Sequence, residues 1–376
     1  MERTLIATAA FGLEAVVRRE IEKLGYPVVR TENGKITFTG HEDAIAKANL
    51  WLRAADRVLV RMAEFKAADF EELYQNIAGI PWEDWIPVDG RIVVDAGSVK
   101  STLTSVPAVQ SVSAKAVYSR LTDFYGIEHF EESGPLFPIK VTLLKDRATV
   151  TLDTTGDGLF KRGYRVQEVA APMKETLASA LVQLSFYRKD RHLADLCCGS
   201  GTIPIEAAML ARNIAPGLSR HFLAEEWPCL SPAIWKKARQ EAYAAMDLDC
   251  ELDIEAVDID PAAIEAAKAN ADAAGVGDDI RFMCMDMADF EARGERGVVV
   301  MNPPYGERIG EREGIDRIYA ALGKLREAHP DWSVFLITSD KTVEESLGTA
   351  NRRRKLYNGR LEACYYQYHG IKKNGK

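Results

Sequence analysis

The sequence predicts an α/β protein in which a doubly wound, Rossmann-like C-terminal domain follows a smaller α+β region. Three observations favour this architecture. From about residue 171 onward, short apolar strands alternate with helices, which is the pattern of a parallel sheet covered on both faces. Several of these strands end in Asp, Asn or Gly, as in nucleotide-binding sheets. The 376 residues exceed one ordinary hydrophobic core, so two or three domains are expected.

Composition favours a soluble enzyme. Hydrophobic residues make up 47% of the chain and charged residues 28%, and no apolar run approaches the ~18 residues that a membrane span needs. The N-terminus lacks the basic and apolar regions of an export signal, so we expect a cytoplasmic protein with no membrane partner. The six cysteines show no paired ligand spacing, which predicts no metal site.

Charge is distributed unevenly along the chain. The net charge is −8, which by itself argues against a nucleic-acid partner. Residues 166–340 hold 18 basic and 30 acidic side chains, whereas residues 341–376 hold 9 basic and 3 acidic ones. The run Arg352-Arg353-Arg354-Lys355 in this tail is either a solvated surface segment or a contact for phosphates.

The first 65 residues alternate strands and helices in the manner of a small ferredoxin-like α+β unit. Apolar periodicity predicts strands at 4–9, 35–39 and 57–63, and helices at 12–24 and 41–55.

Residues 66–155 form a second predicted α+β unit. We expect a helix at 69–80 capped by Asp69, a strand at 91–96, a helix at 106–125 and a hairpin within 138–152. The stretch 156–170, rich in glycine and charge, is the predicted linker to the C-terminal domain.

The C-terminal domain, residues 171–376, carries the candidate chemistry at the ends of its strands. Strands are predicted at 192–196, 253–257, 280–283, 297–301 and 333–338, with helices at 202–211 and 261–274.

A glycine-rich turn joins the first of these strands to its helix, in the segment Asp195-Leu196-Cys197-Cys198-Gly199-Ser200-Gly201-Thr202. Glycines there allow a ligand to approach the backbone, and the helix N-terminus offers N–H donors. A dinucleotide fingerprint would place a third glycine at position 204. Pro204 stands there instead, which disfavours a nicotinamide cofactor.

Two acidic strand ends follow. Asp258 ends the second strand, where a carboxylate can accept the hydroxyls of a ribose. It lies 63 positions after Asp195, so an insertion is expected, with residues 213–250 the candidate. Asp260, before Pro261, is interpreted as a helix cap. Asp286 ends the third strand and is either a cap or an acceptor for an adenine amino group, with Met287 against the ring.

The fourth strand runs into Asn302-Pro303-Pro304-Tyr305-Gly306. This segment indicates the transfer of a methyl group to an exocyclic amine. The two prolines stiffen the turn. The Asn302 side-chain oxygen and the Pro303 carbonyl can accept both protons of an exocyclic amine and so turn its lone pair toward an incoming methyl group. Tyr305 offers a ring on which an extruded base can stack.

Together these residues resemble the class I S-adenosylmethionine-dependent methyltransferases, in their amino-group branch. Further segments resemble the THUMP-domain methyltransferases that modify guanine N2 in 23S ribosomal RNA. These segments are 160–165, 171–175, 211–217, 302–310 and 356–360.

The resemblance implies a ferredoxin-like domain at 1–65, an RNA-binding THUMP domain at 66–155 and a methyltransferase domain at 171–376. It implies S-adenosylmethionine as the cofactor, and 23S ribosomal RNA or a ribosome assembly intermediate as the partner. It also implies catalytic roles for Asn302, Pro303 and Tyr305. The implied cofactor contacts are Asp195, Cys197, Gly199, Gly201, Asp258, Asp286 and Met287.

The same residues are also compatible with other functions. Related enzymes methylate guanine N2 in transfer RNA, and adenine-N6 DNA methyltransferases and protein glutamine methyltransferases share the Asn-Pro-Pro-Tyr loop. An RNA-binding module without activity is a further alternative. The long α+β front region argues against the DNA and protein readings.

Overall fold

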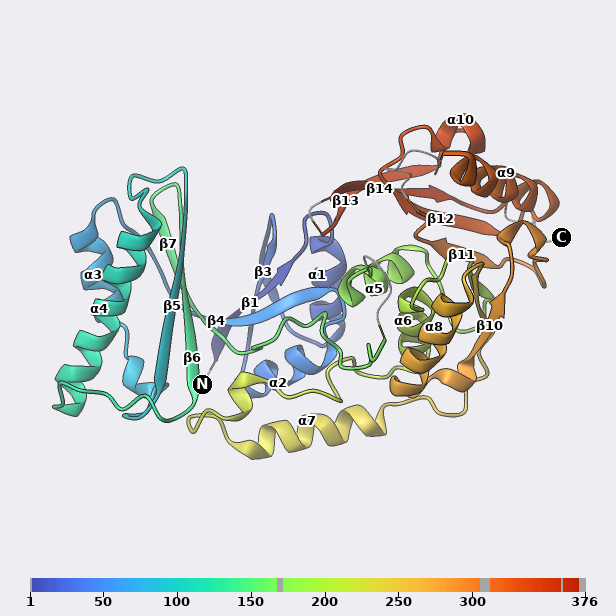
Figure 1. Ribbon diagram of the computed structural model, residues 1–376. Helices are drawn as coiled ribbons and strands as arrows, with labels where there is room; N and C mark the ends of the chain where they lie inside the picture. Colours follow the sequence, from blue (N-terminus) through green and yellow to red (C-terminus); the bar gives the residue numbers. More distant parts are fainter. Residues whose placement is uncertain (1, 168–171, 305–311, 360, 372–376) are drawn as a thin grey trace. The chain divides into compact units, whose positions relative to one another are not determined.

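The computed structural model describes residues 2–167, 172–304, 312–359 and 361–371 (Figure 1). The chain forms two compact units. The first comprises Met1–Thr8, Arg18–Leu159 and Arg220–Glu241, and the second comprises Ala9–Val17, Phe160–Ser219 and Ala242–Lys376. Among the described residues, no helix combines the length and the apolar character that crossing a membrane requires.

One seven-stranded sheet forms the centre of the first unit, with the strand order β2-β3-β1-β4-β7-β6-β5. The long strand β4 therefore joins the β1–β3 part of the sheet to the β5–β7 part. The strands are β1 (Arg3–Ala9), β2 (Val28–Glu32), β3 (Lys35–Gly40), β4 (Ala55–Lys66), β5 (Arg91–Val99), β6 (Leu136–Leu144) and β7 (Arg147–Asp153).

Local caps delimit the helices of the front region. The predicted cap at Asp69 is confirmed, since its carboxylate accepts the Glu72 N–H at 2.8 Å. Ser105 caps the next long helix, and Gly126 ends it at a φ of 69°. The helices are α1 (Glu14–Lys23), α2 (Glu42–Trp51), α3 (Phe70–Ala78) and α4 (Val106–Tyr125), with a 3₁₀ turn η1 at Trp82–Asp84.

The second unit holds another seven-stranded sheet, in the order β10-β9-β8-β11-β12-β14-β13. The first five strands are parallel, and β14 and β13 are antiparallel. This confirms the predicted doubly wound fold. The strands are β8 (Leu193–Asp195), β9 (Ile254–Asp258), β10 (Ile280–Cys284), β11 (Val298–Met301), β12 (Ser333–Thr338), β13 (Arg352–Asn358) and β14 (Leu361–Tyr368).

Helices cover this second sheet. They are α5 (Glu175–Leu184), α6 (Thr202–Ala211), α8 (Pro261–Ala273), α9 (Arg312–Ala328) and α10 (Val343–Leu347), with 3₁₀ turns η3 (Gly277–Asp279) and η4 (Met287–Asp289). The basic run lies in β13, Arg352–Asn358, which is the edge strand of the sheet and for which no strand was predicted. Its first basic residues are exposed, as a surface segment requires. Its pairing partner, β14, supplies the hydrogen bonds that this charged segment could not make alone.

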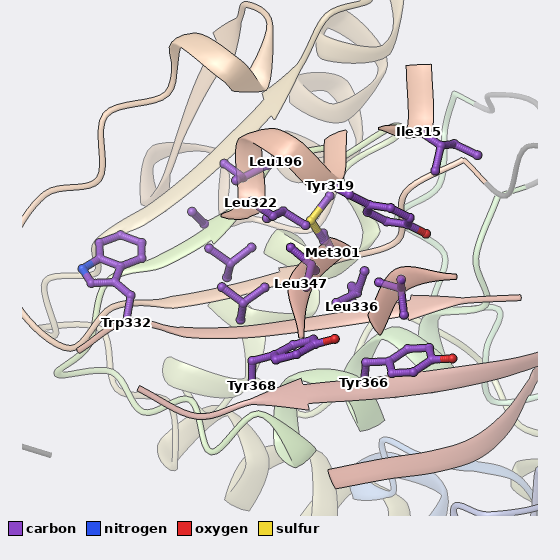
Figure 2. Packing of buried hydrophobic residues seen from close by; sticks show 14 of the residues in the cluster. Leu196, Met301, Ile315, Tyr319, Leu322, Trp332, Leu336, Leu347, Tyr366 and Tyr368 are labelled. Atoms are coloured by element: carbon purple, nitrogen blue, oxygen red, sulfur yellow. The ribbon is translucent and has the colours of Figure 1, made fainter. Parts of the chain in front are cut away.

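A buried apolar cluster fixes the end of β11. Side chains of α9, including Tyr319 and Leu322, meet Met301 of β11 and Leu336 of β12, and all four are essentially inaccessible to water (Figure 2). A Cβ on Gly297 would lie 2.4 Å from the Trp332 ring, so a glycine is required where the strand begins. This packing surrounds β11 with apolar side chains up to Met301.

The predicted insertion between β8 and β9 is present, and part of it belongs to the first unit. It contains η2 (Leu223–Glu225) and α7 (Pro232–Ala244). Trp227 is buried, stacks on Phe137 with ring centres 5.0 Å apart, and contacts Trp85 edge-on at 6.1 Å. Its indole N–H donates to the Leu136 carbonyl at 3.0 Å. The insertion thus completes the core beside β6.

Candidate active site

The predicted site residues come together because parallel strands end at one edge of the second sheet. Asp195 of β8 pairs with Ala256 of β9, and Asp258 pairs with Cys284 of β10. On the other side of β8, β11 is in parallel register. The segments that follow these four strands are therefore neighbours, as in other sheets of this kind.

The glycine-rich turn is held to β9 by its own backbone. The Cys198 N–H donates to the Val257 carbonyl at 2.9 Å, and the Gly199 N–H donates to Asp258 Oδ2 at 2.9 Å. Gly201 has a φ of +81°, and a Cβ there would lie 2.9 Å from the Ala267 side chain of α8. Backbone conformation and close packing both require glycine at this position.

Asp195 lies beneath this turn. It is 1% exposed and accepts the Cys197 N–H at 3.2 Å. Burial raises the pKa of its carboxyl well above the ordinary value, the Cys197 N–H opposes this shift, and the nearby Asp258 adds to it. Among the described residues, its hydrogen bond is to the backbone of the glycine-rich turn, so Asp195 stabilises the conformation of this turn.

Asp258 uses both carboxylate oxygens within the protein. Oδ2 accepts the Gly199 N–H, and Oδ1 accepts the Asp260 N–H at 3.0 Å. Asp260 in turn caps α8 by accepting the Ala262 N–H at 2.9 Å, which confirms its interpretation as a cap. Each Asp258 oxygen keeps a further lone pair for a ligand.

Asp286 also has two protein partners. Oδ1 accepts the Ala288 N–H at 2.9 Å and caps η4, while Oδ2 accepts from Arg317 at 2.8 Å. Arg317 comes from α9, a helix that was not predicted. A lone arginine on a surface helix carries no sequence signal, so it was missed.

A cavity of about 260 Å³ opens between these strand ends and α9. Four predicted cofactor residues line it, namely Cys197, Asp258, Asp286 and Met287. Pro304 of the Asn-Pro-Pro segment also lines it. Asp195, Gly199 and Gly201 are not among its lining residues. The remaining lining residues, none of them predicted, are Leu196, Ile259, Gly314, Arg317 and Ile318.

The Asn-Pro-Pro segment leaves the end of β11 beside this cavity. Asn302 is half-buried, Pro303 is buried and Pro304 is exposed. Met301, immediately before them, is completely buried. Tyr305, the third predicted catalytic residue, lies outside the described residues.

A segment before α5 is tied to the start of α6 by buried polar groups. Arg165 pairs with Glu175 at 3.0 Å and donates to the Thr202 hydroxyl at 3.3 Å. Asn270 of α8 accepts the N–H groups of residues 166 and 167 and donates to the Ser200 carbonyl at 3.1 Å. These contacts link the glycine-rich turn to residues 165–167 of the predicted linker.

Within the described ranges, no three His, Cys, Asp or Glu side chains are grouped so as to hold a metal ion.

Family models cover most of the chain. A model described as "RMKL-like, methyltransferase domain" matches residues 162–367. Models of an RlmL ferredoxin-like domain and of a THUMP domain match residues 4–59 and 67–153.

Two curated relatives align along nearly the whole sequence. The "Putative RNA methyltransferase YpsC" of Bacillus subtilis (strain 168) is 47% identical, and the alignment covers 97% of this chain and 95% of YpsC. The ribosomal RNA large subunit methyltransferase K/L of Syntrophotalea carbinolica is 34% identical over 95% of this chain. That alignment covers only 52% of the K/L protein, so the chain spans about half its length.

Two crystal structures share the complete fold. One, from Listeria monocytogenes, is described as a "predicted N6-adenine-specific DNA methylase". It is 46% identical with a TM-score of 0.94, covering 99% of this chain and 97% of the other. SMU.472, described as a methyltransferase in complex with SAH, is 41% identical with a TM-score of 0.93, covering 99% of both chains.

Proposed function

This chain belongs to the RMKL-like methyltransferase family, and from that premise we propose that it methylates the exocyclic N2 amine of a guanine in 23S ribosomal RNA, using S-adenosylmethionine. The observation that carries this proposal is the position of the Asn-Pro-Pro segment. It follows a completely buried strand end, and Pro304 lines the same cavity as Asp258 and Asp286.

The cavity offers groups suited to a nucleoside. Asp258 would accept the ribose hydroxyls with the lone pairs that its two backbone partners leave. Asp286 would accept from an adenine amino group, with Arg317 holding its carboxylate in place and Met287 against the ring. Bound there, S-adenosylmethionine supplies an electrophilic methyl group.

The strand end orients the target amine. The Asn302 side-chain oxygen and the Pro303 carbonyl would each accept one proton of the –NH₂ group, which directs the nitrogen lone pair toward the methyl group. No strong base is required, because the barrier is lowered by orientation and by fixed dipoles. Tyr305 would stack on the extruded base.

An RNA substrate is supported by the THUMP domain and by the names of the two relatives. The methyltransferase part carries little positive charge of its own, because residues 166–340 contain 30 acidic and 18 basic side chains. Phosphate contacts supply most non-specific nucleic-acid affinity. We therefore assign much of the RNA affinity to the front region and to the basic residues after 340.

The test is methyl transfer by the purified full-length chain. Tritium-labelled S-adenosylmethionine would be offered with 23S ribosomal RNA from a strain lacking the gene, with transfer RNA from that strain, and with duplex DNA. We expect label in the ribosomal RNA, recovered after digestion as N2-methylguanosine, and no label with Asn302→Ala.

The other outcomes assign the competing functions. N2-methylguanosine in transfer RNA alone would make this a transfer-RNA enzyme. Label in duplex DNA as N6-methyladenine would support the description attached to the Listeria structure. Label in none of the three nucleic acids would contradict the proposal.

A further inference from the structure

A second surface of the methyltransferase unit, outside the cavity, combines aromatic and basic side chains. It lies on β13, the edge strand of the sheet (Figure 1), and on the turn formed by residues 10–13. The Arg354 side chain donates to the Gly12 carbonyl at 2.9 Å. Gly12 has a φ of +90°, and a Cβ there would lie 2.6 Å from the Lys355 carbonyl oxygen. The turn is therefore packed tightly against β13.

This docking holds an exposed phenylalanine at the sheet edge. Phe11, between Ala10 and Gly12, is 47% exposed. Its ring meets the Tyr357 ring edge-on, with centres 6.0 Å apart and an interplanar angle of 78°. An exposed aromatic ring on a tightly packed turn offers a flat apolar face on which a base can stack.

Basic side chains flank the aromatic pair. Arg353 and Lys355 lie on the same face of the strand as Tyr357, because side chains alternate along a strand. Lys355 Nζ is 5.6 Å from the Tyr357 ring centre. Arg353 pairs with Glu344 at 3.1 Å and Lys355 with Glu362 at 2.7 Å.

These ion pairs do not prevent phosphate binding. The Arg353 side chain is 62% exposed and that of Lys355 is 52% exposed. Ion pairs in contact with water contribute little, so phosphates can compete for the same cations. Arg352, at the start of the strand, is exposed and takes part in no ion pair with the rest of the described chain.

We propose that this surface, formed by Phe11, Tyr357 and the basic residues of β13, binds a single-stranded segment of the RNA substrate. An unpaired base stacks on the open face of Phe11, and backbone phosphates lie along Arg353 and Lys355. Only unpaired bases offer a free face to an aromatic ring, which selects single strands over duplexes. The inference rests on the proposed RNA substrate.

The test measures binding by the full-length chain to a fluorescent 12-nucleotide oligouridylate and to a 12-base-pair RNA duplex. Stacking on one aromatic ring strengthens binding by roughly 5- to 150-fold, so Phe11→Ala should weaken single-strand binding within that range and leave duplex binding unchanged. Phe11→Trp should retain affinity. Lys355→Gln should lower the salt dependence of single-strand binding by about 0.7 in slope per lost phosphate contact.

Tyr243→Ala is the matched control, because Tyr243 is a similarly exposed aromatic residue in the same unit (59% exposed). Unchanged oligouridylate binding by Phe11→Ala, or equal losses on single strand and duplex, would overturn the inference. Binding is measured apart from turnover. A chain that binds through Phe11 but methylates no RNA would contradict the proposed function alone, and a chain that methylates RNA with Phe11→Ala binding normally would contradict this inference alone.

Discussion

At the scale of single residues, Asp258 combines a structural and a proposed ligand-binding task. Its two oxygens hold the Gly199 and Asp260 N–H groups, so its removal disturbs the turn as well as the cofactor. A substitution to alanine therefore cannot separate the two effects. Asparagine keeps one oxygen acceptor and the side-chain volume, and it removes only the charge and one acceptor.

We expect Asp258→Asn to weaken S-adenosylmethionine binding by about 1.5–3 kcal/mol, the usual cost of losing a hydrogen bond to a charged group. Isothermal titration calorimetry measures this loss, and a thermal melt beside it reports the fold. Asp258→Ala should lose both affinity and stability. Wild-type affinity in the folded Asp258→Asn protein would show that the ribose binds elsewhere.

Asn302 is proposed to act mainly in the transition state, so its effect should appear in the rate of chemistry. Removal of one such hydrogen-bonding group lowers kcat by roughly 100- to 1000-fold. We expect Asn302→Ala to show this fall with little change in KM for the RNA. Single-turnover methylation provides the measurement. A fall in cofactor affinity and thermal stability without a slower chemical step would indicate that Asn302 only shapes the turn.

At the scale of elements, the junction of the glycine-rich turn with α6 depends on Gly201. Alanine there meets both a positive φ and the Ala267 side chain 2.9 Å away. We expect Gly201→Ala to reduce the free energy of unfolding by about 1–3 kcal/mol, the cost of a strained backbone residue. Urea unfolding measures it.

A double-mutant cycle with Ala267→Gly separates the two causes. The second substitution relieves the contact but leaves the backbone strain, so it should restore only part of the loss. Complete restoration would mean that the positive φ contributes nothing.

The opposite end of the same sheet carries a buried charge cluster. His192, before β8, lies 2.9 Å from the Glu255 carboxylate of β9, which also pairs with Arg281 and Arg293. Burial lowers the pKa of His192, but Glu255 and nearby Asp253 outweigh this effect, and the net pKa lies above the ordinary value.

This shift predicts a pH dependence of stability. Because the folded state binds the proton more tightly, the contribution of His192 is full below the unfolded pKa of about 6.5 and is lost as pH rises through the folded pKa. The difference in unfolding free energy between wild type and His192→Gln should therefore shrink above about pH 6.5. Urea unfolding across this range tests it, with exposed His41→Gln as the control. A difference that grows with pH would contradict the assignment.

At the scale of the whole molecule, the insertion returns the chain to the first unit. Trp227 is a large buried side chain at this return, packed against Phe137 and Trp85. We expect Trp227→Ala to destabilise the region around β6 by about 3–5 kcal/mol, as for other large-to-small core substitutions. Hydrogen exchange of peptides from β5 and β6 measures the change locally.

Trp227→Phe should lose less, because it keeps the ring stacking and loses only the bond to Leu136 and some volume. Tyr243→Ala, an exposed change on the same helix-containing insertion, should leave exchange in β5 and β6 unaltered. Unchanged protection in Trp227→Ala would show that the insertion does not support this core.

Local sequence determined the helix caps and the positions of the candidate site residues along the chain. The caps at Asp69 and Asp260 could be predicted because they depend on residues two or three positions away. The glycine-rich turn and the acidic strand ends could be placed because a parallel sheet brings the ends of its strands to one edge. Four of the seven predicted cofactor residues consequently line one cavity.

Other features of the site and of the two sheets were decided only by the tertiary structure. Arg317 joins the site through α9, and residues 352–358, for which no strand was predicted, form β13 because β14 pairs with them. The strand β2 was likewise missed, since its exposed sequence VVRTE acquires order from β3. Trp227 belongs to the first unit although it lies between β8 and β9 in sequence. In each case the contact that decides the structure joins residues far apart in the chain. The periodicity of a short segment does not predict such contacts.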